Sequence, residues 1–180
     1  YATAAQQNID CKVHICKKGL AEEAAAVIKR KRLKRIGFEP TWMHVGPYEK
    51  LKKSLGSGAK LVPVSGTVEG FRAIKSLAEI ARIRAAVEAN SEAYSKTLGR
   101  VKVGVREMDV AAELDFQMRM LGAEKSAFET IVASGARTAL PHAHPTSRKI
   151  KSNELLLIDM GATLEGYASD MTRMSFLGTP

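Results

Sequence analysis

Two aspartates near the carboxyl end of the chain need a chemical explanation. Asp159 ends the apolar run 155–158, and Asp170 follows eleven residues later inside a second stretch that favours a strand. A lone carboxylate is costly in a buried strand. In a hairpin whose turn is centred between Leu164 and Glu165, the two aspartates are directly opposite, with Cβ atoms about 4.5–5.5 Å apart.

Two like charges at this spacing require either a cation between the carboxylates or a proton on one of them. Hard oxygen donors of this kind suit Mn²⁺, Mg²⁺ or Zn²⁺. The spacing supports a second interpretation equally well, in which one aspartate caps a turn and the other is exposed. Asp159 and Asp170 are therefore candidate metal ligands, with this alternative left open.

Two of the four histidines lie just before this predicted hairpin. His142 and His144 occupy the proline-flanked stretch 140–145. A histidine there could be a metal ligand, a proton shuttle or a plain loop residue, and spacing alone favours the loop residue. His14 falls on the polar side of a predicted strand and His44 in a predicted loop, so both are expected to be structural or exposed.

The other short motifs do not point to a different chemistry. Gly56-Ser57-Gly58 is not followed by the Gly-Lys-Ser/Thr ending that a phosphate-binding loop needs. The sequence contains no HExxH, no CxxC pair and no GxSxG. Ser134 is followed by Gly135 but lacks the rest of a nucleophile elbow.

The elements that must position these residues change character along the chain. The first part alternates strands and helices, which is typical of an α/β domain. Its predicted elements are strand 10–16, helix 20–32, strand 35–39, helix 47–55 and strand 60–64.

The second part places two helices before a set of strands, which indicates an α+β domain. A capping box at Ser76 and Glu79 opens a long helix that ends near Gly99. The remaining predicted elements are helix 109–121 and strands 128–133, 155–160 and 167–176. We place the domain division after residue 70, giving domains 1–70 and 71–180, within the interval between Val64 and Ser76.

Composition excludes several classes of protein. The 180 residues are 45% hydrophobic and 26% charged, and no apolar run reaches the roughly 20 residues that a membrane helix needs. The net charge of +9 is concentrated in residues 29–35, which read KRKRLKR. A phosphate-binding role is conceivable, but a solvated helix end is favoured because cations complement a helix C-terminus and no nucleic-acid motif accompanies the run. We expect neither a nucleic-acid nor a membrane partner, and the two cysteines indicate reduced thiols in the cytoplasm.

Four motifs follow one another at consistent spacing. They are residues 128–135, 141–143, 158–162 and 166–173, which read FETIVASG, PHA, IDMGA and GYASDMTR. Together they resemble the Xaa-Pro aminopeptidases and Xaa-Pro dipeptidases (prolidases), the pita-bread metallopeptidases. Residues 72–80 resemble the entry to the catalytic domain of that family, and residues 1–70 resemble the later part of its creatinase-type N-terminal domain.

The resemblance implies an α+β fold that is the first half of a pita-bread catalytic domain, preceded by part of an α/β creatinase-type N-terminal domain. It implies two divalent metal ions, most often Mn²⁺ with Co²⁺ or Zn²⁺ as alternatives. Asp159 matches the first carboxylate ligand and Asp170 the metal-bridging one. His142 matches the histidine near the scissile bond, whereas His144 has no counterpart in the pattern.

Further expectations follow from the same resemblance. Thr172 and Arg173 are expected to support the ligands, and the full-length parent is expected to act on proline-containing peptides as a homo-oligomer, a dimer. The leading function is that of an Xaa-Pro aminopeptidase. The alternatives are a prolidase and a non-catalytic pita-bread binding module, against which the retention of both aspartates argues. A methionine aminopeptidase is less favoured, because that family does not usually carry the N-terminal domain.

One feature of the resemblance bears on activity. The remaining ligands of the family, one His and two Glu, belong to a stretch beyond residue 180. We therefore expect the sequence to be a segment of a longer parent, truncated at both ends, and inactive as a peptidase by itself.

Overall fold

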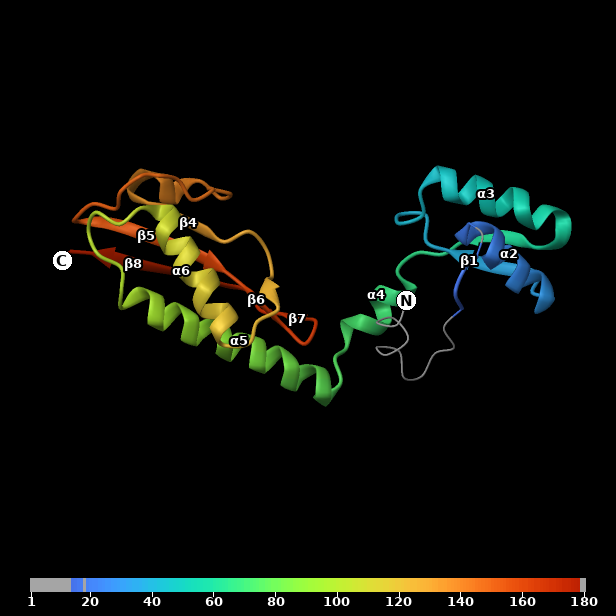
Figure 1. The fold of residues 1–180 in the computed structure, drawn as a ribbon, viewed down its shortest axis with the longest axis horizontal. Helices are drawn as coiled ribbons and strands as arrows, with labels where there is room; N and C mark the ends of the chain where they lie inside the picture. The colour runs from blue at the N-terminus through green and yellow to red at the C-terminus, as the bar shows by residue number, and fades with distance from the viewer. Residues whose placement is uncertain (1–13, 18, 179–180) are drawn as a thin grey trace. The chain divides into compact units, whose positions relative to one another are not determined.

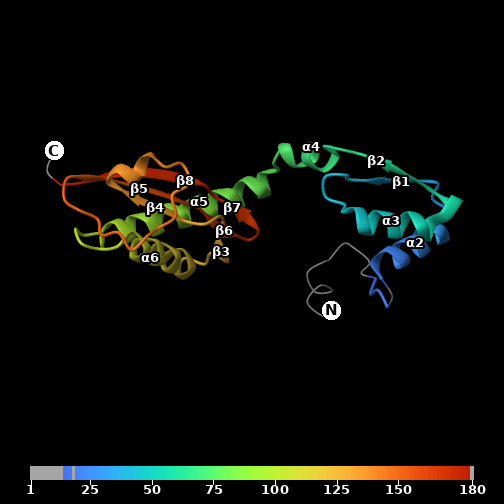
Figure 2. The ribbon, with the colours of Figure 1, turned by 90° about the horizontal axis from the view of Figure 1, so that it is seen from above.

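A computed structural model describes residues 14–17 and 19–178. The chain divides into two compact units, Tyr1–Ile74 and Lys75–Pro180, which Figures 1 and 2 show from two directions. The boundary along the chain falls between Ile74 and Lys75, whereas the sequence pattern places the division after residue 70. No helix within the described ranges is both long and apolar enough to span a bilayer.

The first unit is a small α/β arrangement. Strands β1 (Arg35–Phe38) and β2 (Lys60–Pro63) pair in parallel, and helices α2 (Leu20–Arg30) and α3 (Val45–Leu55) pack against them, on one side of the strands in Figure 2. Three buried side chains from the two helices form its core. They are Ala25, Leu51 and Leu55.

Three details of this unit differ from the sequence prediction. The predicted strand 10–16 lies mostly outside the described residues, and residues 14–16 are not in a strand. Helix α3 begins at Val45 and not at residue 47, since the first turn of a helix tolerates Pro47. A short helix, α4 (Thr67–Ala73), buries no residue and so leaves no apolar periodicity to detect. The turn η1 (Gly56–Gly58) joins α3 to β2.

The second unit packs two helices on an antiparallel sheet. Helices α5 (Leu77–Leu98) and α6 (Glu107–Met120) cover one face of the sheet β4-β5-β8, as seen in Figure 1. The strands are β4 (Ile131–Ser134), β5 (Glu154–Met160) and β8 (Met171–Leu177). The short strands β3 (Lys125–Ser126), β6 (Ala162–Leu164) and β7 (Tyr167–Ala168) form a second sheet.

The core of this unit explains why its two sheet faces differ. Alternate residues of β5 point toward the helices, so Leu156, Ile158 and Met160 are buried among side chains of α6 and β4. The opposite face is open: Leu155 is 43% exposed and its cross-strand neighbour Phe176 is 46% exposed. Asp159 belongs to this open face by the same alternation.

The predicted capping box at the start of α5 is confirmed. The Ser76 hydroxyl accepts a hydrogen bond from the backbone N–H of Glu79 at 3.3 Å, and the Glu79 carboxylate accepts one from the backbone N–H of Ser76 at 2.7 Å. These bonds occupy N–H groups that a helix start leaves without partners. The Glu79 carboxylate also accepts a bond from Tyr167 and has a lowered pKa, the Ser76 bonds being the main cause.

Candidate active site

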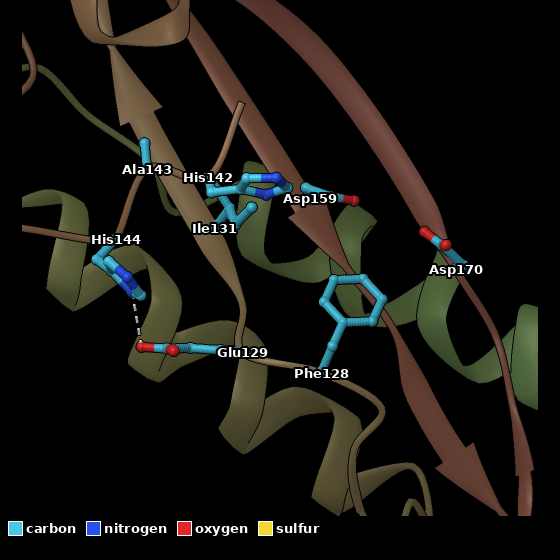
Figure 3. Close-up of a pocket in the computed structure, with 8 residues that line it drawn as sticks. All are labelled: Phe128, Glu129, Ile131, His142, Ala143, His144, Asp159 and Asp170. Carbon is cyan, nitrogen blue, oxygen red and sulfur yellow. Dashed lines mark hydrogen bonds and ion pairs between the residues drawn. The ribbon is translucent and has the colours of Figure 1, made fainter. Parts of the chain in front are cut away.

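The sequence motifs converge on one pocket of about 390 Å³ in the second unit. The three predicted site residues His142, Asp159 and Asp170 all line it, although they come from a loop, from β5 and from the segment before β8 (Figure 3). The other residues of its wall are Phe128, Glu129, Ile131, Ala143 and His144.

The two aspartates face one another, but they are not directly opposite as predicted. In the register of β5 and β8, Asp159 pairs with Thr172 and Met160 with Met171. Asp170 lies two residues before Thr172, so it is a diagonal neighbour of Asp159. Diagonal neighbours of this kind are about 7–8 Å apart. In Figure 3 their carboxylates point toward each other across the pocket.

The observed register has a physical origin in the turn. Leu164 pairs with Tyr167, so the turn residues are Glu165 and Gly166, with φ of 48° and 76°. A two-residue turn with positive φ at both positions matches the right-handed twist of the strands, and glycine serves well at the second. The predicted centre between Leu164 and Glu165 was therefore wrong by one residue, which moves the partner of Asp159 by two.

A glycine allows the strands to close tightly between the two aspartates. A Cβ on Gly161 would lie 2.2 Å from the carbonyl oxygen of Ser169 and 2.7 Å from the ring of Phe128. Ser169 also ties the chain back to Ala162, since its N–H donates to the Ala162 carbonyl at 2.9 Å. This close approach restricts the backbone next to Asp159 and Asp170.

The two residues expected to support the ligands behave differently. The Thr172 hydroxyl donates to a carboxylate oxygen of Asp159 at 2.8 Å, which restricts the orientation of that carboxylate. Arg173 pairs with Ile158 in the register, so it projects toward the other face of the sheet. Its guanidinium donates to the carbonyl of Thr172 at 2.9 Å, which gives it no role toward Asp159.

The two loop histidines point in different directions. His142 is exposed, and in Figure 3 its ring extends across β4 toward Asp159. His144 turns toward Glu129, and its Nδ1 lies 3.0 Å from a carboxylate oxygen of Glu129, with both side chains 73% exposed. Both histidines line the pocket, but only the ring of His142 points toward Asp159.

The residues present fit part of a divalent metal centre. Two carboxylates that face each other without a lysine or arginine in the pocket wall supply hard oxygen donors and no competing cation. Within the described ranges, however, no group of three or more His, Cys, Asp or Glu side chains could hold a metal ion. Asp159 and Asp170 thus provide two donors, and a complete centre needs others.

Sequence reasoning did not single out Glu107, a buried carboxylate beside this region. It lies in the first turn of α6, is completely buried, and hydrogen-bonds both Ser134 and Thr146. Burial by itself would raise its pKa, but these hydrogen bonds together outweigh burial and hold the pKa below its ordinary value. The sequence gives no signal that would single it out, because Glu107 looks like any acidic residue in the first turn of a helix.

Comparison with known proteins decides the family. Residues 81–180 match the model of metallopeptidase family M24, and residues 1–74 match the creatinase/prolidase N-terminal domain. The chain belongs to metallopeptidase family M24. The predicted family and fold class, an α+β pita-bread half preceded by a creatinase-type domain, are thereby confirmed.

Individual members of the M24 family show how much of the protein is covered. The chain is 40% identical to the uncharacterized peptidase YqhT of Bacillus subtilis over 161 residues, 89% of this chain and 45% of that protein. It resembles the solved X-Pro aminopeptidase of Thermotoga maritima at 31% identity with a TM-score of 0.92, covering 100% of this chain and 51% of that one. It resembles the Xaa-Pro dipeptidase of Bacillus anthracis at 33% identity with a TM-score of 0.93, covering 99% and 50%. The chain therefore spans about half the length of these relatives.

Proposed function

We propose that the complete protein is a metal-dependent aminopeptidase that releases the N-terminal residue from Xaa-Pro peptides. The observation that carries the proposal is the pocket itself, where two facing carboxylates and His142 meet on the open face of the sheet. Asp159 and Asp170 are its metal ligands, and His142 is its residue beside the substrate. Mn²⁺ is the proposed metal, with Co²⁺ or Zn²⁺ as alternatives.

Each side chain has a task that its position supports. When bound, divalent ions of this kind lower the pKa of a water and polarise the carbonyl that is attacked. Thr172 holds the carboxylate of Asp159 in one orientation. His142 has a ring free to hydrogen-bond the peptide near the scissile bond, and Phe128 and Ile131 offer apolar wall for a pyrrolidine ring.

The corresponding dipeptidase activity is the second candidate, favoured by the equally close likeness to the Bacillus anthracis Xaa-Pro dipeptidase. A prolidase cleaves dipeptides only, so the length of the accepted peptide separates the two functions. We further propose that the complete protein is cytoplasmic and forms a homodimer. Both proposals rest on the family resemblance and, for the compartment, on the two cysteines in the chain.

The test is an assay of the complete protein with added Mn²⁺ on an Xaa-Pro dipeptide and on an Xaa-Pro tripeptide. Cleavage of the tripeptide at the bond before proline supports the aminopeptidase. Cleavage of the dipeptide alone would assign a prolidase instead. No cleavage of either peptide, with metal bound, would favour the non-catalytic binding module.

A further inference from the structure

One buried carboxylate outside the pocket binds the segments on both sides of His142. Oε1 of Glu107 accepts hydrogen bonds from the backbone N–H and the hydroxyl of Ser134, both at 2.9 Å. Its Oε2 accepts one from Nε of Arg137 at 3.2 Å, and two from the backbone N–H and hydroxyl of Thr146, at 3.2 and 2.7 Å. Glu107 itself is 0% exposed, so these five bonds replace the water that a carboxylate would otherwise hold.

The three partners delimit residues 135–146, which we call the histidine loop. Ser134 directly precedes the loop, Arg137 lies in its turn η2 (Gly135–Ala139), and Thr146 is its last residue. Arg137 also reaches the middle of the loop, because its Nη2 donates to the carbonyl oxygen of His144 at 2.7 Å. Glu107 is therefore connected to both ends of the loop and, through one arginine, to the segment that carries the histidines.

We infer that Glu107 is a positioning residue for His142, which it keeps over the aspartate pocket by clamping the histidine loop through Arg137 and Thr146. The inference rests on the proposed function, since it gives His142 a task beside the substrate. Outside the clamp, the loop is held where the Thr146 carbonyl accepts from the backbone N–H of Met108 at 3.1 Å and where His144 lies beside Glu129. His142 itself is exposed, and the adjoining Ala143 is buried. Without Glu107, the segments at Ser134, Arg137 and Thr146 lose their common acceptor, so the loop holds His142 less firmly over the pocket.

A neighbouring ion pair provides the comparison, because its arginine contacts the clamp only at Ser134, which precedes the histidine loop. Arg148 donates two hydrogen bonds to Glu154, at 2.6 and 2.9 Å, and one to Ser134. Its side chain is 26% exposed and that of Arg137 is 29% exposed, so the two arginines are matched in burial. The guanidinium of Arg148 has its hydrogen-bond partners outside the histidine loop, whereas that of Arg137 has one within it.

The experiment compares Arg137→Met with Arg148→Met in the complete protein, with Glu107→Gln as a third variant. Hydrogen exchange of the peptide covering residues 135–147, followed by mass spectrometry without metal or substrate, reports the order of the loop. We expect Arg137→Met and Glu107→Gln to speed this exchange by about tenfold, as expected when local opening becomes easier. Arg148→Met removes a bond to Ser134 but none to the loop itself, so it should speed the exchange of this peptide much less than Arg137→Met.

Kinetics with an Xaa-Pro substrate then separates positioning from stability. We expect Arg137→Met to lower kcat by about 10-fold to 100-fold with KM little changed. A catalytic side chain that is displaced by about 1 Å, here that of His142, can lower the rate by this factor. In a His142→Ala background the same substitution should cause no further loss, since the effect passes through His142. Arg148→Met should lower the melting temperature while kcat stays within about twofold of wild type.

The outcomes are distinguishable. A loss of kcat on Arg137→Met that persists undiminished in the His142→Ala background would overturn the inference, as would unchanged hydrogen exchange of the loop. A wild-type protein that binds metal but cleaves no Xaa-Pro peptide would overturn the proposed function and with it any catalytic meaning of the clamp. An active wild type with an Arg137→Met variant as fast as Arg148→Met would overturn the inference alone.

Discussion

Replacing Glu107 by glutamine tests how strongly one buried carboxylate stabilises the second unit. The amide keeps the shape of the side chain but has one acceptor oxygen where the carboxylate has two. We expect the amide oxygen of the glutamine to face Arg137 and Thr146, which supply three donors. The amide N–H₂ group then faces the backbone N–H of Ser134. That N–H lies in a completely buried residue and loses its acceptor.

The magnitude follows from these bonds. One buried N–H without an acceptor costs about 1–3 kcal/mol, and hydrogen bonds to a charged group are worth about 1 kcal/mol more than those to a neutral one. The loss of the ion pair with Arg137 adds to this. We expect Glu107→Gln to lower the free energy of unfolding by about 2–5 kcal/mol at neutral pH, which leaves a folded protein if its stability is in the ordinary range.

The stability that the Glu107 carboxylate contributes depends on pH. The pKa of Glu107 is lowered in the folded state from an ordinary value of 4.5, so its contribution to stability is complete above that pH and is lost as the pH falls through the folded-state pKa. The difference between wild type and Glu107→Gln should therefore be largest near neutrality and shrink below about pH 4.5. Other carboxylates titrate in both proteins and cancel in the difference.

The assay is denaturant unfolding of the chain at low concentration, followed by far-ultraviolet circular dichroism. Trp42 is the single tryptophan and lies in the first unit, so its fluorescence reports the unfolding of that unit. This unfolding transition is an internal control that the substitution of Glu107 should not shift. Glu113→Gln is the matched variant, because Glu113 lies on the same helix, is partly exposed, and bonds Arg100 and Gln117 through one carboxylate oxygen that an amide retains. A Glu107→Gln protein as stable as Glu113→Gln, or a difference that does not shrink in acid, would refute the reasoning.

Three further predictions concern the site and the open sheet face. In the complete protein, Asp159→Ala or Asp170→Ala should remove bound metal, whereas His142→Ala should retain it and lower turnover about 10²–10⁴-fold; metal analysis and peptide assays on the same samples check both. Gly161→Ala should reduce metal binding and lower the melting temperature, because the new Cβ would lie 2.2 Å from a backbone oxygen. The 180-residue chain alone should cleave no Xaa-Pro peptide and should self-associate through its open sheet face. Met174→Lys, at a position 54% exposed, should therefore reduce the sedimentation coefficient at high concentration.

Periodic burial is the part of this fold that the sequence reports well. The capping box at Ser76 and the long amphipathic α5 were predicted because both are local patterns of residue type. The same holds for the strand that carries Asp159. Helix α4 was missed for the complementary reason, because it buries no side chain.

Register and long-range polar contacts were beyond local patterns. The turn at Glu165 and Gly166 shifted the partner of Asp159 from Asp170 to Thr172, and choosing between adjacent turn positions depends on backbone φ angles. The role of Glu107 depends on partners 27 and 39 residues away, at Ser134 and Thr146. A pattern read along the chain cannot show that one first-turn glutamate is buried and another exposed.

The geometry of the pocket bears on how a metal centre is built in this family. Asp159 lies on β5 and Asp170 in the segment before β8, and the sheet that carries them rests on an apolar core shared with α6. The two carboxylates therefore face each other before any further donor is supplied, and a cation held between them, as the proposed function requires, would relieve their mutual repulsion. Metal bound to two donors alone would stabilise the fold by RT ln(1 + [metal]/Kd), which is small where the dissociation constant is high. Each added donor raises the affinity, so stability and catalytic competence should rise together as the centre is completed.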